Sequence, residues 1–273
     1  MKTKKYKLPL TILNLIVGIL VISPILYALS VSFMTSSEIF TMPPKLLPKG
    51  LYLGNYTAAI NTVPIFRFII NSFIVSIMVT IGQIITSSLS AYAFSFYKFK
   101  GKKILFIAII ATMMIPSEAI IISNYLTISS MKLLDTYRGL VIPNLTSAMG
   151  IFIMRQYFLT VPKELKEASV MDGCTSFQFL TKILMPISRP ATGALGIYIF
   201  LMTWNQYMWP LLITSKVEMR TVQIGLSMLQ SSEVQAFGMI LAGIILIIIP
   251  SIFIFIIGQK QLVDGMTSGS VKG

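Results

Sequence analysis

The chain has 273 residues, of which 55% are hydrophobic and only 11% are charged, and its mean hydropathy is +0.82. Soluble domains average about 25% charged residues, so this composition excludes an ordinary soluble protein and indicates an integral membrane protein. Histidine is absent and Cys174 is the single cysteine, which removes the usual general base and any internal disulfide or cysteine metal site.

Long apolar stretches with at most one charged residue predict the membrane spans in chain order. A spanning helix needs about 20 apolar residues. Six stretches approach that length: 8–33, 67–96, 104–126, 139–158, 191–212 and 237–259. We expect a kink at Pro24 and a break near Pro116. The fourth stretch reaches full length only if Arg155 snorkels or faces protein. The sequence therefore predicts an all-α integral membrane protein with a single transmembrane domain over residues 1–273.

Lysine and arginine are distributed unevenly between the expected loops, and this asymmetry makes up most of the net charge of +13. The richer side holds the N-terminus, the 98–103 turn, the 162–190 loop and the C-terminus. The positive-inside rule places these segments in the cytoplasm, so we expect a multi-pass cell-membrane protein with both termini inside. The first apolar run is too long for a usual signal peptide and is expected to remain as an anchor. A nucleic-acid surface is disfavoured because the charges are scattered over short loops.

The segment 162–190 reads PKELKEASVMDGCTSFQFLTKILMPISRP and interrupts two apolar runs with a polar loop. Its composition predicts two short helices that meet at Asp172-Gly173, where glycine adopts a left-handed C-cap freely. Thr175 or Ser176 is expected to cap the second helix, with Gln178 near the capping-box position. The expected apolar face of that helix consists of Phe177, Leu180, Ile183 and Leu184, and its expected end is set by Pro186 and Pro190. A folded polar loop of this kind indicates a docking surface for another protein.

The loop resembles the EAA loop of ABC importer permeases. The residues that carry this resemblance are Glu167-Ala168-Ser169, then Asp172-Gly173, then Ile183-Leu184-Met185-Pro186, with Ser169 in place of the second alanine. Further segments resemble carbohydrate importer permeases in the same order along the chain: Asn71-Ser72, 134–137, Gly139-Leu140, 204–211 and the glycine-rich tail 265–273. The match is to the maltose-type family and to its second, shorter permease subunit.

This resemblance implies the type I ABC importer permease fold, with six transmembrane helices and a cytoplasmic EAA coupling-helix loop. It also implies a non-catalytic permease subunit that forms half of the translocation pore for a sugar or oligosaccharide. The implied partners are a homologous permease subunit, two cytoplasmic ABC ATPases and an extracytoplasmic sugar-binding protein. The chain has no G-x-x-x-x-G-K-[ST] phosphate loop. ATP and Mg are therefore expected on the partner ATPase, and this chain is expected to bind no cofactor or metal and to hold no catalytic residue.

The resemblance assigns roles to particular residues. The residues expected to contact the ATPase are Glu164, Glu167, Ala168, Ser169, Asp172, Gly173, Phe177 and Pro186. Three residues of the C-terminal tail are candidates for a further ATPase contact, with a disordered end as the alternative: Gly269, Val271 and Lys272.

Polar groups within membrane spans indicate the solute path, because they are costly in lipid and functional by default. Glu118 would cost about 2.5–3.5 kcal/mol at the centre of a lipid-facing helix, so it must face protein or water. The candidate path residues are Glu118, Asn124, Tyr125, Trp204, Asn205 and Tyr207. Two alternatives stay open: Glu118 near the outer end, bonded to a neighbouring subunit, and Trp204, Tyr207 and Trp209 as an interfacial aromatic belt.

Two other function classes compete with an importer subunit. A stand-alone secondary transporter or channel is disfavoured because six spans are few, no inverted repeat is evident, and such a protein has no need of a folded coupling loop. A membrane-embedded enzyme is disfavoured because the sequence has no histidine, no metal-ligand cluster and no paired carboxylates within a span.

Overall fold

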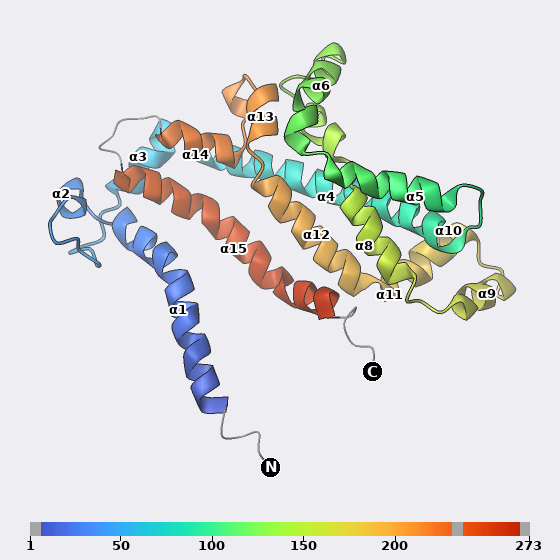
Figure 1. Ribbon diagram of the computed structural model, residues 1–273. Coiled ribbons are helices and arrows are strands. Elements are labelled where there is room, and N and C mark those ends of the chain that lie inside the picture. Colours follow the sequence, from blue (N-terminus) through green and yellow to red (C-terminus); the bar gives the residue numbers. More distant parts are fainter. Residues whose placement is uncertain (1–6, 231–236, 268–273) are drawn as a thin grey trace. The chain divides into compact units, whose positions relative to one another are not determined.

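The computed structural model describes residues 7–230 and 237–267, and in these ranges every regular element is a helix (Figure 1). The chain divides into two compact units. One comprises Met1–Phe66 and Gly225–Ile249, and the other comprises Arg67–Ile224 and Pro250–Gly273. The second unit holds the 162–190 loop and all the path candidates.

Three described helices are long and apolar enough to cross a membrane, or up to five if each of two bent pairs counts as one span. The three are α1 (Lys7–Ser32), α4 (Ile65–Phe96) and α15 (Phe237–Thr267), which cover the first, second and sixth expected stretches. The remaining helices of the first unit and of the link to α15 are short: α2 (Ser36–Ile39), α3 (Gly54–Thr62) and α14 (Val222–Gln230).

The third expected stretch is divided at Pro116. Helix α5 (Lys102–Ala111) continues into a 3-10 turn, Thr112–Met114, and α6 (Ser117–Ser130) leaves the break at an angle of 99°. Ile115 is extended, with φ −88° and ψ 116°, because the ring of a following proline excludes the helical conformation. The predicted break near Pro116 is confirmed.

The fourth expected stretch, 139–158, is not one continuous helix. It consists of α7 (Tyr137–Val141), a 3-10 turn at Ile142–Asn144, and α8 (Ala148–Phe158). Pro143 lies in the 3-10 turn, and Ser147 starts α8 by accepting a hydrogen bond from the N–H of Gly150 (3.4 Å). Arg155 faces protein, because its guanidinium lies 4.1 Å from the Phe106 ring centroid and its Nε donates to the carbonyl of Phe94 (3.3 Å).

The fifth expected stretch, 191–212, is also divided. Helix α12 (Arg189–Trp204) ends at Asn205, and a separate helix, α13 (Met208–Ile213), follows. Asn71 on α4 holds the segment after α13 in place. Its Nδ2 donates to the carbonyls of Glu218 (2.7 Å) and Arg220 (2.8 Å), and its Oδ1 accepts from the Tyr137 hydroxyl (2.7 Å).

The core of the second unit lies where α8 and α12 pack on α4. A Cβ added to Gly150 of α8 would collide with Ser87 of α4, and one added to Gly82 would collide with Leu145. Such small residues let membrane helices approach closely. Buried apolar side chains, including Val79, Met154 and Leu195, fill this core.

Candidate functional site

The first half of the 162–190 loop is a short helix with a defined end. Helix α9 (Lys163–Met171) follows Pro162 and stops at Gly173, which has φ +76°. The N–H of Gly173 donates to the carbonyl of Val170 (3.0 Å), and that of Cys174 donates to the carbonyl of Ser169 (2.9 Å). These two bonds form a Schellman motif and confirm the predicted glycine stop.

The second half of the loop starts with the predicted capping box. The Gln178 N–H donates to the Thr175 hydroxyl (3.2 Å), and the Thr175 N–H donates to Oε1 of Gln178 (2.9 Å). The helix then runs through α10 (Ser176–Gln178), a π-helical turn (Phe179–Leu184) and α11 (Met185–Ile187).

The second helix ends at Ile187, between Pro186 and Pro190, so the expectation that these prolines end it before the next span is confirmed. Pro186 lies inside α11, and Pro190 lies in the first turn of α12. The N–H and the hydroxyl of Ser188 both donate to the carbonyl of Leu184, at 2.9 and 2.7 Å. These two hydrogen bonds close the last turn of the helix, and the chain bends by 81° at this point into α12.

The buried side of the second helix differs from the expected face. Phe179, Leu180 and Leu184 are buried, whereas Phe177 is 67% exposed. The ring of Phe179 packs against Phe96 and Tyr92 of α4, at centroid distances of 5.6 and 6.2 Å. Phe177 is therefore excluded from the core and lies on the outer surface of the loop.

Lys166 anchors α9 to the same end of α4. Its Nζ lies 4.9 Å from the ring centroid of Tyr97 and 5.3 Å from the centroids of Tyr92 and Phe96. A cation surrounded by aromatic faces contributes about 0.5–2 kcal/mol per interaction, more where water is excluded. The loop is thus fastened to α4 by an aromatic cluster and is not a free linker.

The outer surface of the loop combines exposed apolar and acidic side chains. Met171 is 88% exposed and lies beside exposed Val170, Asp172 and Gly173 in sequence, at the turn before Phe177. The other expected coupling residues that are exposed are Glu164, Glu167, Ala168 and Pro186. Ser169 is the exception, because it is only 3% exposed and its hydroxyl donates to the carbonyl of Lys166 (2.7 Å). The tail candidates Gly269, Val271 and Lys272 lie outside the described residues.

A hollow of about 620 Å³ lies elsewhere in the second unit, where several helices are interrupted. Of the six path candidates, Glu118, Asn124, Asn205 and Tyr207 line it. The break at Pro116 places Glu118 in the first turn of α6, and Asn205 is the residue at which α12 ends. Interrupted helices within a membrane are tolerated where they line a cavity or are buried in protein.

Hydrogen bonds hold the polar lining in position. The Ser117 hydroxyl donates to Oε1 of Glu118 (3.0 Å). The Asn205 Nδ2 donates to the carbonyl of Leu201 (2.8 Å), and its Oδ1 accepts from Gln223 (3.2 Å). The side chains of Glu118 and Asn205 are therefore oriented by neighbouring protein groups before any solute enters.

The other two path candidates do not line the hollow. Trp204 is 1% exposed and packs edge-on against Phe73 (5.0 Å) and stacked on Phe200 (5.8 Å), so it belongs to the interior and not to an interfacial belt. Tyr125 is partly buried against the core.

Sequence reasoning missed several polar lining residues. Gln83 of α4 lines the hollow and donates to the carbonyl of Asn144 (2.7 Å), and Gln206 also lines it. An amide within a predicted span is costly in lipid, and that signal identifies Gln83. The same signal applies to Asn144, which lies within the expected stretch 139–158 and lines the hollow at the break between α7 and α8.

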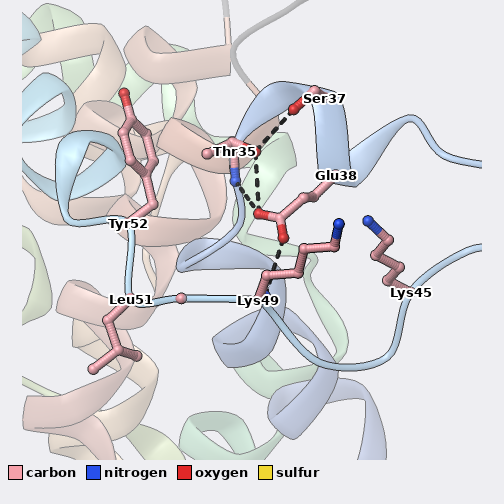
Figure 2. Close-up of a pocket in the computed structure, with 8 residues that line it drawn as sticks. Thr35, Ser37, Glu38, Lys45, Lys49, Leu51 and Tyr52 are labelled. Carbon is pink, nitrogen blue, oxygen red and sulfur yellow. Dashed lines mark hydrogen bonds between the residues drawn. The ribbon is translucent and has the colours of Figure 1, made fainter.

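A separate hollow of about 560 Å³ lies in the first unit and is shown in Figure 2. Its Glu38 carboxylate accepts from the N–H of Thr35 (3.0 Å), the Thr35 hydroxyl (3.1 Å) and the N–H of Lys49 (3.0 Å). The backbone hydrogen bonds from Thr35 and Lys49 hold the pKa of Glu38 below its ordinary value. The Glu38 carboxylate thus fixes the conformation of the segment that follows α1, and its role is structural.

Comparison with known proteins gives consistent results for sequence and fold. Residues 83–267 match the family described as binding-protein-dependent transport system inner membrane component. The chain is 34% identical to the arabinooligosaccharides transport system permease protein AraQ of Bacillus subtilis, over 98% of this chain and 96% of that protein. It is 37% identical to the sn-glycerol-3-phosphate transport system permease protein UgpE of Agrobacterium fabrum, over 93% and 94% of the two chains.

Among solved structures, the fold is similar to a chain from the crystal structure of a bacterial ABC transporter involved in the import of the acidic polysaccharide alginate. The TM-score is 0.83 with 22% sequence identity, over 95% of this chain and 98% of that chain. At this level of identity the likeness concerns the fold, which is that of an ABC importer permease.

Proposed function

The chain belongs to the family of binding-protein-dependent transport system inner membrane components, and from this membership we propose that it is one of two permease subunits in an ATP-driven importer of a sugar or oligosaccharide. In this role the chain itself is not catalytic. ATP and Mg bind on a separate ATPase, which drives the pore between inward-open and outward-open states.

The observation that carries the proposal is the rigid loop with an exposed apolar surface. Met171 and Phe177 are exposed, while Phe179 and Lys166 fasten the loop to α4. Exposed apolar side chains on a well-ordered frame are typical of a protein interface. The surface is thus suited to receive a cytoplasmic ATPase.

Two helices connect this loop to the hollow and provide a route for movement. Helix α4 carries Tyr92 and Phe96 at the loop and Gln83 at the hollow. Helix α12 begins directly after the loop and ends at Asn205, which lines the hollow. A displacement of the loop by the ATPase therefore reaches the hollow through two continuous helices.

The hollow is proposed as part of the solute path, with Glu118, Asn124, Asn205 and Tyr207 as the groups that face a solute. Amide and carboxylate groups form hydrogen bonds with hydroxyl groups, and an aromatic ring offers a stacking surface for a sugar. The open alternative for Glu118, a bond to a neighbouring subunit, is less favoured because Glu118 lines the same hollow as the amide side chains of Asn124 and Asn205.

The assembly and orientation follow from the same proposal. The partners are a homologous permease in a heterodimer, two ABC ATPases and an extracytoplasmic binding protein. Both termini and the 162–190 loop lie in the cytoplasm, so that the loop and the C-terminal tail can reach the ATPases.

Reconstitution into proteoliposomes tests the proposal. The reconstituted complex consists of both permeases, the ATPases and the binding protein. It should take up a sugar only when ATP is present on the side of the membrane where the ATPases lie. Omission of the ATPases should abolish uptake. Solute uptake by this chain without ATPases would contradict the proposal and favour a stand-alone carrier or channel.

A further inference from the structure

We propose that the hollow admits uncharged polyhydroxylated solutes and rejects anionic ones, with Glu118 as the group that determines this selectivity. The inference rests on the proposed function, because it takes the hollow as part of the solute path. It names the charge class of the solute, which the family membership leaves open.

The charge carried by the described lining of the hollow is negative. Among the described residues that line the hollow, Glu118 carries the one carboxylate and none is lysine or arginine. Sites that pass or bind anions present arginine, lysine or oriented backbone N–H groups to the negative charge. This half of the path has the opposite sign.

Within residues 7–230 and 237–267, the Glu118 carboxylate forms no ion pair. It is exposed in the hollow, and within the described chain its recorded hydrogen bond comes from the neutral hydroxyl of Ser117 (3.0 Å). A fixed carboxylate repels a phosphate or a uronate, and the repulsion is stronger in a partly enclosed site than in bulk water. The same carboxylate accepts strong hydrogen bonds from sugar hydroxyls.

The remaining polar groups of the lining can both donate and accept hydrogen bonds. The amides of Gln83, Asn124, Asn205 and Gln206 each offer donors and acceptors, and the Tyr198 and Tyr207 rings add apolar faces with a hydroxyl. A neutral sugar presents hydroxyls that both donate and accept, together with apolar ring faces. The side chains that line the hollow in the described part of the chain therefore match a polyol, and none of them carries a positive charge.

The relatives do not decide this point, because they span both charge classes. One is named for neutral arabinooligosaccharides and another for glycerol 3-phosphate, which is an anion. The discriminating feature lies in this chain, at Glu118.

The test uses the complete complex in proteoliposomes with a panel of neutral oligosaccharides, uronic-acid oligosaccharides and glycerol 3-phosphate. The wild-type complex should take up a neutral sugar in an ATP-dependent manner. ATP-dependent uptake confined to anionic solutes would overturn the inference while leaving the proposed function intact. Absence of ATP-dependent uptake for every solute would instead count against the proposed function.

The second measurement removes the selectivity of the binding protein. The transported neutral sugar and its derivative oxidised to a carboxylate at the primary hydroxyl are titrated into the complex without binding protein. Wild type should bind the neutral sugar at least about tenfold more tightly, a ratio equivalent to about 1.4 kcal/mol. Glu118→Gln should reduce the ratio severalfold, and Glu118→Lys should invert it.

Equal or tighter binding of the oxidised sugar by wild type would overturn the inference, and this comparison does not depend on any variant folding. A ratio that is unchanged in an assembled Glu118→Gln complex would also overturn it. Asn124→Asp serves as the matched control, because it adds a carboxylate to the same hollow and should increase the ratio.

Discussion

The coupling loop and the hollow display their side chains in opposite ways. In the loop, the polar groups at the helix ends are hydrogen-bonded to one another in the Thr175–Gln178 cap and the Gly173 stop. The apolar side chains of Met171 and Phe177 are exposed. At the hollow, polar Glu118 and Asn205 line the open space, while the apolar Trp204 is buried outside its lining. A rigid apolar surface suits a protein partner, whereas a polar concave surface suits a hydrated solute.

Because of this difference, the two regions should respond to different kinds of substitution. The loop should be sensitive to backbone conformation and to its attachment on α4. The hollow should be sensitive to charge and hydrogen-bonding groups, and the buried residues behind it should affect only stability. Each variant below tests one side of this contrast.

The largest effect is expected at Trp204, behind the hollow. Trp204→Ala removes a side chain that packs on Phe73 and Phe200, and such truncations cost about 3–5 kcal/mol. The thermal transition of the purified complex should fall while the ratio of uptake between two sugars is unchanged. Tyr207→Leu should instead change the ratio of uptake between two sugars and leave the thermal transition unchanged. A changed ratio in Trp204→Ala would contradict the structural role of Trp204 and indicate that it contacts the solute.

The next effect is expected at Gly173, in the loop. Its φ of +76° costs a residue with a side chain about 1–2 kcal/mol, although the space around its Cα is open. Gly173→Asp adds a charge to the docking surface as well as strain, so uptake should fall at least about tenfold and the ATPase should dissociate more readily. Gly173→Asn has a similar shape without the charge and should be milder. Normal uptake by Gly173→Asp would refute the docking surface.

A smaller effect is expected at Lys166, which joins the loop to α4. Lys166→Met keeps the aliphatic stem but removes the cation from the rings of Tyr92, Phe96 and Tyr97. We expect a few-fold rise in ATP hydrolysed per solute transported, because an interaction of about 0.5–2 kcal/mol is lost. Lys166→Arg should restore the wild-type ratio. Equal losses in Met and Arg variants would indicate a packing role alone.

The smallest effect is expected at Glu38, in the segment after α1. The pKa of its carboxyl is lowered in the folded chain, so its stabilisation is complete above the ordinary value of 4.5 and is lost as pH falls through the folded value. Hydrogen exchange at the Lys49 amide, corrected for its intrinsic pH dependence, should rise in that window. Glu38→Gln should abolish this pH dependence, and a rise that persists in the variant would contradict the assignment.

The loop was the more predictable region, because its signals are local. Gly173 and the Thr175–Gln178 box depend on residues at most five positions apart, and both are confirmed. Phe177 was placed on the wrong face because a regular helical period does not allow for the π-helical turn at Phe179–Leu184. The end of this helix had a local signal as well, because Pro186 and Pro190 lie on either side of its last residue, Ile187.

The hollow was less predictable, because distant segments form it. Glu118 was found from the cost of a carboxylate in a span, and Gln83 could have been found in the same way. Trp204 was expected to face the path, but its burial depends on Phe73, which lies far away in sequence. The break within 139–158 had local signals in Pro143 and Ser147, and these were outweighed by the apolar composition of the stretch.

Site-specific crosslinking from the loop tests the central claim most directly. A photoreactive amino acid at Met171, the exposed residue at the turn, should capture the partner ATPase in membranes that contain the complete complex. The same group at Leu159, exposed just before the loop, provides the control. The account predicts an ATPase adduct from position 171 whose yield changes on ATP addition. Absence of an ATPase adduct from position 171 in an actively transporting complex would contradict it.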